Sequence, residues 1–246
     1  MTNQEAGRQK LHGPGLTDVR MMTVAHSNFR RELGLTPALV RAVSDGDQHR
    51  TSMLTEHTTQ WLGYLHHHHS IEDDLLWDVL LARVPDELAP LVHVMQTQHE
   101  HVATLLDQAH VQLDRWSRTA SRSDRDAAAA VLSELCAALF EHLNAEETHL
   151  LPIMARHITA AEWEEFTRQG MESIPKRMII LGFGMMLYEG DPEAIEIEIQ
   201  KLPAPLRRIL PPLGRLSYRR YARRIHGTPT PTRGIGTASH YPRSSA

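Results

Sequence analysis

The chain has 246 residues, a formal net charge of −4 and 41% hydrophobic residues, a composition typical of a folded globular protein that excludes fibrous and wholly disordered chains. Its one cysteine, Cys136, can form neither an internal disulfide nor a thiolate metal site, which excludes zinc fingers and iron–sulfur proteins and favours a cytoplasmic location. The longest apolar run, residues 178–187, is about half a membrane span, so no transmembrane segment is predicted. The unusual feature is histidine, whose 17 copies outnumber the 4 Phe, 4 Trp and 5 Tyr combined.

Four segments carry apolar residues at the three-and-four spacing of amphipathic helices, and strand periodicity is absent. Gly34 is expected to end the first helix, Pro85 stops the second, and Pro152 kinks or closes the fourth. Because short polar connections join helices of this length, we predict an all-α fold with an up-down-up-down four-helix bundle over residues 16–157. The four helices are expected over residues 17–33, 47–83, 90–116 and 124–151.

A helical extension is predicted over residues 158–226. Thr159 and Glu162 form a capping-box pattern at the start of a short helix that Gly170 is expected to stop. Two more short helices are expected to begin near residues 173–175 and 191–192, followed by an Arg-rich helix over roughly 206–225. We expect residues 1–15 to be flexible and residues 227–246 to form a disordered tail.

The charge is divided unevenly along the chain. Residues 1–200 hold 16 basic and 30 acidic residues, whereas residues 201–246 hold 10 basic and no acidic residues. The simplest interpretation is that the Arg-rich 206–226 segment docks on the acidic bundle, and the alternatives are contact with nucleic acid or an anionic membrane. Residues 178–187 could pack on the bundle or form a homodimer contact.

Two histidine–glutamate pairs lie on the apolar faces of predicted helices. His68 and Glu72 are four residues apart, so they share one face of the second helix, and His142 and Glu146 repeat this arrangement in the fourth helix. Buried polar groups without a partner cost about 1–3 kcal/mol each, so these side chains must be paired. One such pair is often a core histidine satisfied by a carboxylate, whereas two pairs in one bundle indicate a metal site.

His26 and His99 add one inward imidazole each from the first and third helices. The predicted bundle therefore directs four imidazoles and two carboxylates toward one interior. This donor set suits two first-row metals bridged by carboxylates about 3.5–4 Å apart, with iron favoured over manganese or zinc.

These residues resemble the hemerythrin-like, or HHE cation-binding, family. The resemblance covers roughly residues 26–157 and rests on four stretches that hold the six candidate ligands. It implies a non-heme di-iron centre that meets dioxygen, hydrogen peroxide or nitric oxide. The stretches are HSNFRREL with His26, HHHHSIEDDLLW with His68 and Glu72, QHEHVATLL with His99, and HLNAEETHLLP with His142 and Glu146.

The third helix departs from the pattern of oxygen-carrying hemerythrins, which place two histidines four residues apart there. The corresponding neighbours of His99 are Met95 and Ala103, so the fifth imidazole is missing from its expected place, and His101 could replace it only if the helix rotates or bulges. We hypothesise that one metal keeps an additional open position, which favours turnover of peroxide or nitric oxide over reversible oxygen carriage.

Other polar residues could be ligands or could support them. His66, His67 and His69 cannot all face inward, because consecutive helix positions are about 100° apart, and we interpret them mostly as solvent-facing or supporting residues. Trp61, Tyr64 and Trp77 are interpreted as core residues rather than the lining of a gas channel. The secondary candidates for the metal site are His69, Asp73, His101, Glu147, His149 and Tyr64.

The predicted function is that of a cytoplasmic di-iron protein in oxidative or nitrosative stress, with catalase-like peroxide decomposition as one possible activity. No side-chain nucleophile separate from the metal centre is predicted, since the sequence has no phosphate-binding glycine loop and no dinucleotide fingerprint. The alternatives are a sensor of iron or oxygen that signals through the basic C-terminal segment, and an iron-storage protein. Storage would require many metals per chain, and the candidate ligands suffice for about two.

Overall fold

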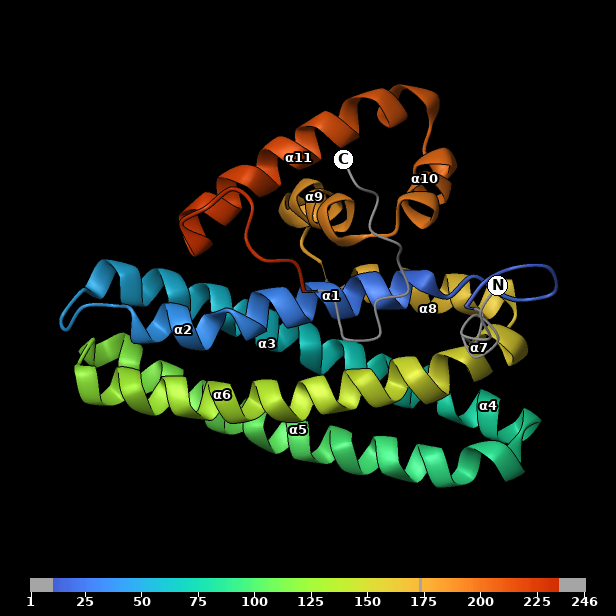
Figure 1. Cartoon of the computed structure of the whole chain (residues 1–246), viewed down its shortest axis with the longest axis horizontal. Helices are drawn as coiled ribbons and strands as arrows, with labels where there is room; N and C mark the ends of the chain where they lie inside the picture. Colours follow the sequence, from blue (N-terminus) through green and yellow to red (C-terminus); the bar gives the residue numbers. More distant parts are fainter. Residues whose placement is uncertain (1–10, 173, 235–246) are drawn as a thin grey trace, which may run out of the picture.

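The computed structural model describes residues 11–172 and 174–234, which are helical and contain no strand, so the predicted all-α fold is confirmed. Figure 1 shows a bundle of long, roughly parallel helices with a smaller group of C-terminal helices against one side. The elements are α1 (Arg20–Gly34), α2 (Thr36–Arg41), α3 (Gln48–Leu75), α4 (Trp77–Arg83), α5 (Pro85–Thr119), α6 (Arg122–Ala145), the π-helix η1 (Glu146–Leu150), α7 (Leu151–His157), α8 (Ala160–Glu172), the 3-10 helix η2 (Lys176–Met178), α9 (Ile179–Glu189), α10 (Pro192–Lys201) and α11 (Ala204–His226).

Local sequence explains where the long helices begin and end. Asp47 and Ser121 cap α3 and α6, because each side chain accepts a hydrogen bond from a backbone N–H in the first turn. α5 begins at Pro85, whose fixed φ suits the first helical position, and it ends at Ala120, which has a φ of 48°. α5 therefore begins earlier than predicted and contains Pro90 near its start.

The bundle is closed by contacts of α3 with α1 and α5, and of α6 with α1 and α5. Its interior is filled by apolar side chains such as Leu65, Leu132 and Leu139, each at most 1% exposed. Complete burial of a leucine contributes roughly 1.5–3 kcal/mol, so this interior is the main source of stability.

Besides the earlier start of α5, three boundaries differ from the sequence predictions. The predicted second helix is divided at Leu76 into α3 and α4, and the fourth is interrupted by η1 before Pro152. The capping box of α8 is confirmed, since Glu162 Oε2 accepts hydrogen bonds from both the backbone N–H and the hydroxyl of Thr159. Gly170 does not stop α8, which continues to Glu172.

The C-terminal helices join the bundle through α9 and α11. These two helices cross closely at Gly184 and Gly214, where a Cβ added to Gly184 would meet the carbonyl oxygen of Gly214. α11 also contacts α3, and its Tyr218, Ala222 and Ile225 belong to the same apolar core as the bundle leucines.

A buried ionic network holds the two parts together. Arg31 of α1 forms ion pairs with Glu32 and with Glu189 of α9, and all three side chains have 0% exposure. His226 Nε2 of α11 lies 2.9 Å from Glu32 Oε2. The Arg31 guanidinium also stacks on the ring of Tyr218, 4.8 Å from its centroid.

The Arg-rich segment uses only one face for packing. Arg208, Arg215, Arg219, Arg220, Arg223 and Arg224 are exposed, and none of them forms an ion pair with another described residue. Residues 227–234, expected to begin a tail, lie against α9, where the Tyr188 hydroxyl donates to the Pro231 carbonyl (2.6 Å). The rest of that predicted tail and residues 1–10 lie outside the described residues. Within the described ranges no helix combines the length and apolarity required to cross a membrane.

Candidate metal centre

A polar layer crosses the bundle between two apolar clusters. α1, for example, places His26 between Met22 of one cluster and Phe29 of the other, and α3, α5 and α6 change from apolar to polar to apolar at the same level. Because apolar side chains cover the layer on both sides, its histidines and carboxylates lie in a dry interior where each needs a partner.

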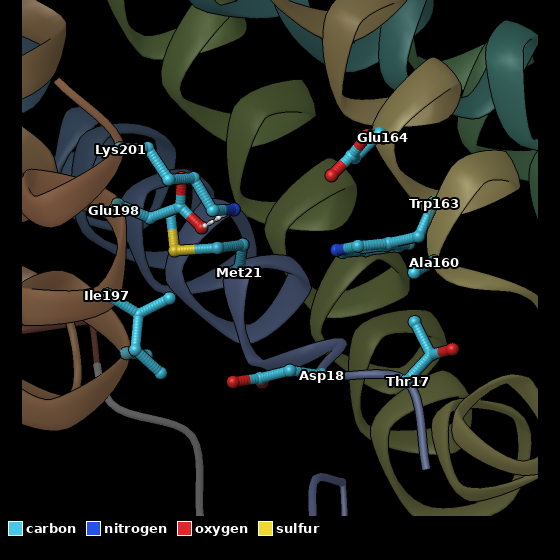
Figure 2. Close-up of a pocket in the computed structure, with 10 residues that line it drawn as sticks. Thr17, Asp18, Met21, Ala160, Trp163, Glu164, Ile197, Glu198 and Lys201 are labelled. Atoms are coloured by element: carbon cyan, nitrogen blue, oxygen red, sulfur yellow. Dashed lines mark hydrogen bonds and ion pairs between the residues drawn. The ribbon is translucent and has the colours of Figure 1, made fainter. Parts of the chain in front are cut away.

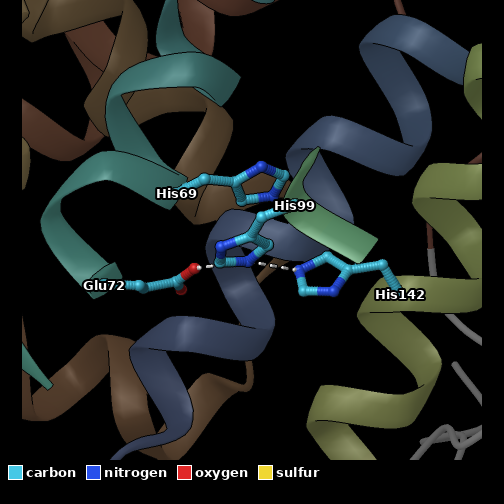
Figure 3. Close-up of side chains that lie close together, drawn as sticks. All are labelled: His69, Glu72, His99 and His142. Atoms are coloured by element: carbon cyan, nitrogen blue, oxygen red, sulfur yellow. Dashed lines mark hydrogen bonds and ion pairs between the residues drawn. The ribbon is translucent and has the colours of Figure 1, made fainter. Parts of the chain in front are cut away.

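The buried side chains of this layer form two groups that share one carboxylate. In each group, ligand atoms from four side chains lie within 4.8 Å of one another, and Glu72 belongs to both groups. Figure 3 shows the group made by α3, α5 and α6. The groups are His69, Glu72, His99 and His142, and His26, His68, Glu72 and Glu146.

Most of the donor atoms lie close together without forming hydrogen bonds, the exception being His99 Nε2, which lies within hydrogen-bond distance of His142 Nε2 (3.2 Å). His68 Nε2 is 3.1 Å from Glu72 Oε1, and His26 Nε2 is 3.2 Å from Glu146 Oε2. Nevertheless several of these atoms lack a hydrogen-bond partner among the described residues. They are both carboxylate oxygens of Glu72 and of Glu146, and Nε2 of His26, His68 and His69. Atoms that are close but misaligned for hydrogen bonding can point to a common position between them, as the ligands of one cation do. These residues therefore fit bound metal ions.

Hydrogen bonds on the far side of the rings orient the imidazoles. His26 Nδ1 lies 2.9 Å from Glu147 Oε1, and His99 Nδ1 lies 2.9 Å from Asp73 Oδ1. A carboxylate that accepts a hydrogen bond from Nδ1–H keeps the proton on Nδ1 and leaves the Nε2 lone pair facing the two groups, which is the tautomer that a metal ligand requires. Glu147 and Asp73 thus support histidines and belong to neither group.

Three residues that the sequence analysis missed support this layer from outside. Each hydrogen-bonds to a histidine or carboxylate of the site, but an isolated Arg, Trp or Gln carries no sequence signal for such a role. Only the packing of α1, α4 and α5 against the rest of the bundle reveals them. They are Gln98, 3.3 Å from His142 Nδ1, Trp77, which donates to Asp73 Oδ1 (2.6 Å), and Arg30, which donates to Glu147 Oε1 (2.6 Å).

The π-helix η1 explains how two consecutive carboxylates are buried together. In a regular α-helix Glu146 and Glu147 would point about 100° apart. The wider π-helical turn begins at Glu146, so that this residue reaches the second group while Glu147 reaches the outer nitrogen of His26. Such turns are frequent at functional sites.

Burial and neighbouring charges shift the pKa values of these groups strongly. Burial, together with the nearby Glu146 carboxylate, raises the pKa of Glu72 well above its usual range. Burial and neighbouring imidazoles lower the pKa values of His68 and His69 well below 6.5. For His26 burial acts in the same direction but is outweighed by the two glutamates of η1, and its pKa rises to about 9. Cations between the groups would favour ionised carboxylates and neutral imidazoles.

The structure brings all six principal candidates together and adds His69. His69 was a secondary candidate interpreted as mostly solvent-facing or supporting, and the solvent-facing part is wrong, because its side chain is only 5% exposed and its ring stacks on His99 with centroids 4.2 Å apart. No second imidazole lies four residues from His99, because α5 carries Met95 and Ala103 at those positions. The fifth imidazole comes from α3, next to His68, rather than from α5 beside Met95.

Several secondary candidates lie elsewhere. His101 and His149 are exposed, so neither belongs to the two buried groups. His66 is exposed and His67 is half-buried, as expected for solvent-facing positions. Tyr64 is half-buried outside both groups, and its hydroxyl accepts a hydrogen bond from Gln60 (2.8 Å).

A small cavity of about 130 Å³ lies away from the metal groups, between α1, α8 and α10 (Figure 2). Trp163 and Met21 line it together with polar side chains that include Lys201 and Glu198, and none of its lining residues belongs to the histidine layer. It is smaller than typical small-molecule pockets of roughly 300–1,000 Å³.

The fold and the site define a helical-bundle protein whose core carries histidine and glutamate groups able to hold metal cations. Comparison with protein families agrees with this class: residues 17–154 match the hemerythrin HHE cation-binding domain, and the chain belongs to that family. No curated protein and no solved structure matched the chain.

Proposed function

We propose that the chain is a non-heme di-iron protein that binds or reacts with hydrogen peroxide, dioxygen or nitric oxide. The observation that carries this proposal is the pair of four-residue groups that share Glu72. Five imidazoles and two carboxylates without a thiolate suit iron better than manganese or zinc. Bound iron would supply reversible electron exchange and open coordination for a small ligand.

With His69, the two groups offer five imidazoles, so the number of imidazoles does not by itself favour turnover over reversible oxygen carriage. Peroxide turnover is retained as the activity to be tested, and a role in oxidative or nitrosative stress follows from it. The single cysteine supports a reducing, cytoplasmic location.

The chain's own residues have two tasks in this function. Glu147 and Asp73 hold the Nδ1 protons of His26 and His99, which keeps both rings in one tautomer and orientation. The apolar clusters on both sides of the layer, to which Phe29 and Met95 belong, exclude bulk water. A small uncharged species can enter such a site at lower desolvation cost than an ion.

The decisive experiment is iron content per chain, measured by elemental analysis on protein loaded with ferrous iron without oxygen. We expect about two irons in the wild type, since two groups are present. Glu72→Ala should lose both ions, because both groups use this carboxylate, whereas His69→Ala should weaken only one. His101→Ala is the matched control, since it removes an exposed histidine and should leave the iron content unchanged.

Circular dichroism on each variant confirms that the helices remain. Peroxide consumption and the near-ultraviolet absorption of the iron-loaded protein are then followed together. Retention of both irons in Glu72→Ala, or one zinc in the wild type, contradicts the proposal.

A sensor that signals through the Arg-rich segment is the second candidate function. It is supported by the six exposed arginines of α11 that lack ion pairs with described residues. Deletion of α11 would be a poor test, because Tyr218 and Ala222 belong to the core. The combined change Arg219→Glu and Arg220→Glu alters only the exposed face. If this variant loses capture of DNA or of a partner protein while it keeps its iron, the sensor function is supported.

A further inference from the structure

A chain of aromatic rings leads from the metal groups to the C-terminal helix α11. The Phe29 ring lies 5.1 Å from the His68 ring and 5.8 Å from the Trp61 ring, measured between centroids. Trp61 Nε1 donates a hydrogen bond to the hydroxyl of Tyr221 (3.3 Å). The path thus connects α3 and α1 of the bundle with α11, and Tyr221 lies outside the residues that match the family.

The Tyr221 hydroxyl lies next to a base. Its oxygen is 2.5 Å from His57 Nδ1, and His57 Nε2 faces the Glu32 backbone carbonyl at 3.4 Å. Because a carbonyl only accepts, Nε2 carries the proton of a neutral His57, and Nδ1 is left to accept from the phenol. Burial lowers the pKa of His57 to about 4, so the neutral form prevails near pH 7.

The phenol itself cannot ionise easily, since burial raises the pKa of Tyr221. Oxidation of a buried phenol that keeps its proton would create a cation in an apolar interior, which is costly. A base within hydrogen-bond distance removes this cost, because the proton can leave with the electron. Of the side chains on this path, those of Tyr221 and Trp61 are the most readily oxidised. Phe29 acts only as a contact between them and His68.

We propose that Trp61 and Tyr221 form an electron relay that reduces the metal pair by one electron after its oxidation by a peroxide. Trp61 gives one electron to the oxidised pair, and Tyr221 returns one electron to Trp61. The Tyr221 O–H bond breaks, its proton forms a bond to His57 Nδ1, and a neutral tyrosyl radical and an imidazolium remain. After these steps Tyr221 has lost one electron and one proton, the proton is on His57, and the electron would be taken up by metal ions held by the two groups.

This relay rests on the proposed di-iron function and gives it a further task. When no reductant reaches the buried layer, an oxidising equivalent is moved away from the ligand imidazoles, which would otherwise be oxidised themselves.

The test is electron paramagnetic resonance of iron-loaded protein, frozen at increasing times after addition of hydrogen peroxide. We expect a tyrosyl radical whose hyperfine pattern collapses when the protein contains ring-deuterated tyrosine. Tyr221→Phe should lose this signal, and Trp61→Phe should lose it as well because the path is interrupted. Tyr188→Phe is the matched control and should keep it, since Tyr188 hydrogen-bonds to Pro231 and lies off the path.

A second readout is the position of oxidative damage, mapped by peptide mass spectrometry after peroxide treatment. In Tyr221→Phe the oxidising equivalent should stop at Trp61, so Trp61 oxidation should increase relative to the wild type. In His57→Leu the phenol has no base, and the same increase is expected.

The outcomes separate the two proposals. If the wild type binds two irons and consumes peroxide but shows no tyrosyl radical, or if the radical persists in Tyr221→Phe, the relay is wrong and the di-iron function stands. If the wild type binds no iron or leaves peroxide unchanged, the proposed function is wrong and the relay falls with it.

Discussion

Replacement of Arg31 by methionine tests whether the buried ionic network joins the bundle to its C-terminal helices. Methionine keeps much of the aliphatic volume but removes the guanidinium. Glu32 keeps His226 as a partner at 2.9 Å, whereas Glu189 Oε1 keeps only the backbone N–H of Gly234 at 3.3 Å. Removing one member of a buried charged network costs about 3–5 kcal/mol, because it leaves a buried charge without compensation.

The assay is urea unfolding of the metal-free protein, followed by circular dichroism, with the wild type measured in parallel. Arg168→Met is the matched control, since Arg168 pairs with Glu165 and Glu172 on the surface, where such pairs contribute about 0–1 kcal/mol. A loss of free energy in Arg31→Met as small as that in the control would refute the network as a source of stability.

The network also predicts how a second change should act. In the double variant Arg31→Met with Glu189→Leu, the carboxylate that lost its partner is absent as well. We expect this variant to recover a substantial part of the loss, because replacing all the charges of a buried pair by apolar side chains is often neutral. Equal stability of the single and double variants would show that the loss arises from packing alone.

Three further predictions concern other parts of the chain. The pKa of His57 is lowered from 6.5 to about 4, so between these pH values the unfolded chain binds a proton at His57 that the folded chain does not bind. The difference in the free energy of unfolding between the wild type and His57→Leu should therefore shrink as the pH falls from 6.5 to 4 in parallel urea titrations. A difference that stays constant over this range contradicts the prediction. Gly184→Ala should destabilise the fold, because the added Cβ would collide with the Gly214 carbonyl. Its urea midpoint should be lower than that of the control Gly182→Ala, whose added Cβ has no atom within 4 Å. Equal midpoints would show that α9 and α11 can move apart without cost. Cys136 is buried and its pKa is raised to about 12, so iodoacetamide should modify it only after unfolding, and rapid labelling of the native protein would contradict its burial.

The all-α fold and the four inward histidine–glutamate positions were predictable because each depends on helix periodicity alone. His68 and Glu72 share a face at any helix rotation, and the same is true of His142 and Glu146. Apolar neighbours on those faces then show which direction is inward.

His69 was not predictable in this way. Periodicity assigns one inward direction to a helix, yet α3 packs against α1 on one side and α5 on the other, so two adjacent residues can both be buried. His68 serves the group near α1 and His69 the group near α5 and α6. A broad buried face is a property of the assembled bundle and leaves no mark in the sequence.

The π-helix and the ionic network were missed for a similar reason. Glu146 and Glu147 read as rivals for one inward position until the π-helical turn buries both. Nothing in the sequence pairs Arg31 and Glu32 with His226, because charged residues are seldom fully buried unless paired and His226 lies far from the other two in the chain.

The contribution of α11 to the core means that the unit that folds is larger than the domain that matches the family. The family match ends at residue 154, but Tyr218 and Ile225 complete the apolar interior, and His226 pairs with the carboxylate of Glu32 in α1. A transplant cut at the family boundary would expose Glu32 and Arg31 together with the apolar surface that α11 covers. A chimera that keeps this bundle folded would therefore have to carry its C-terminal helices with it.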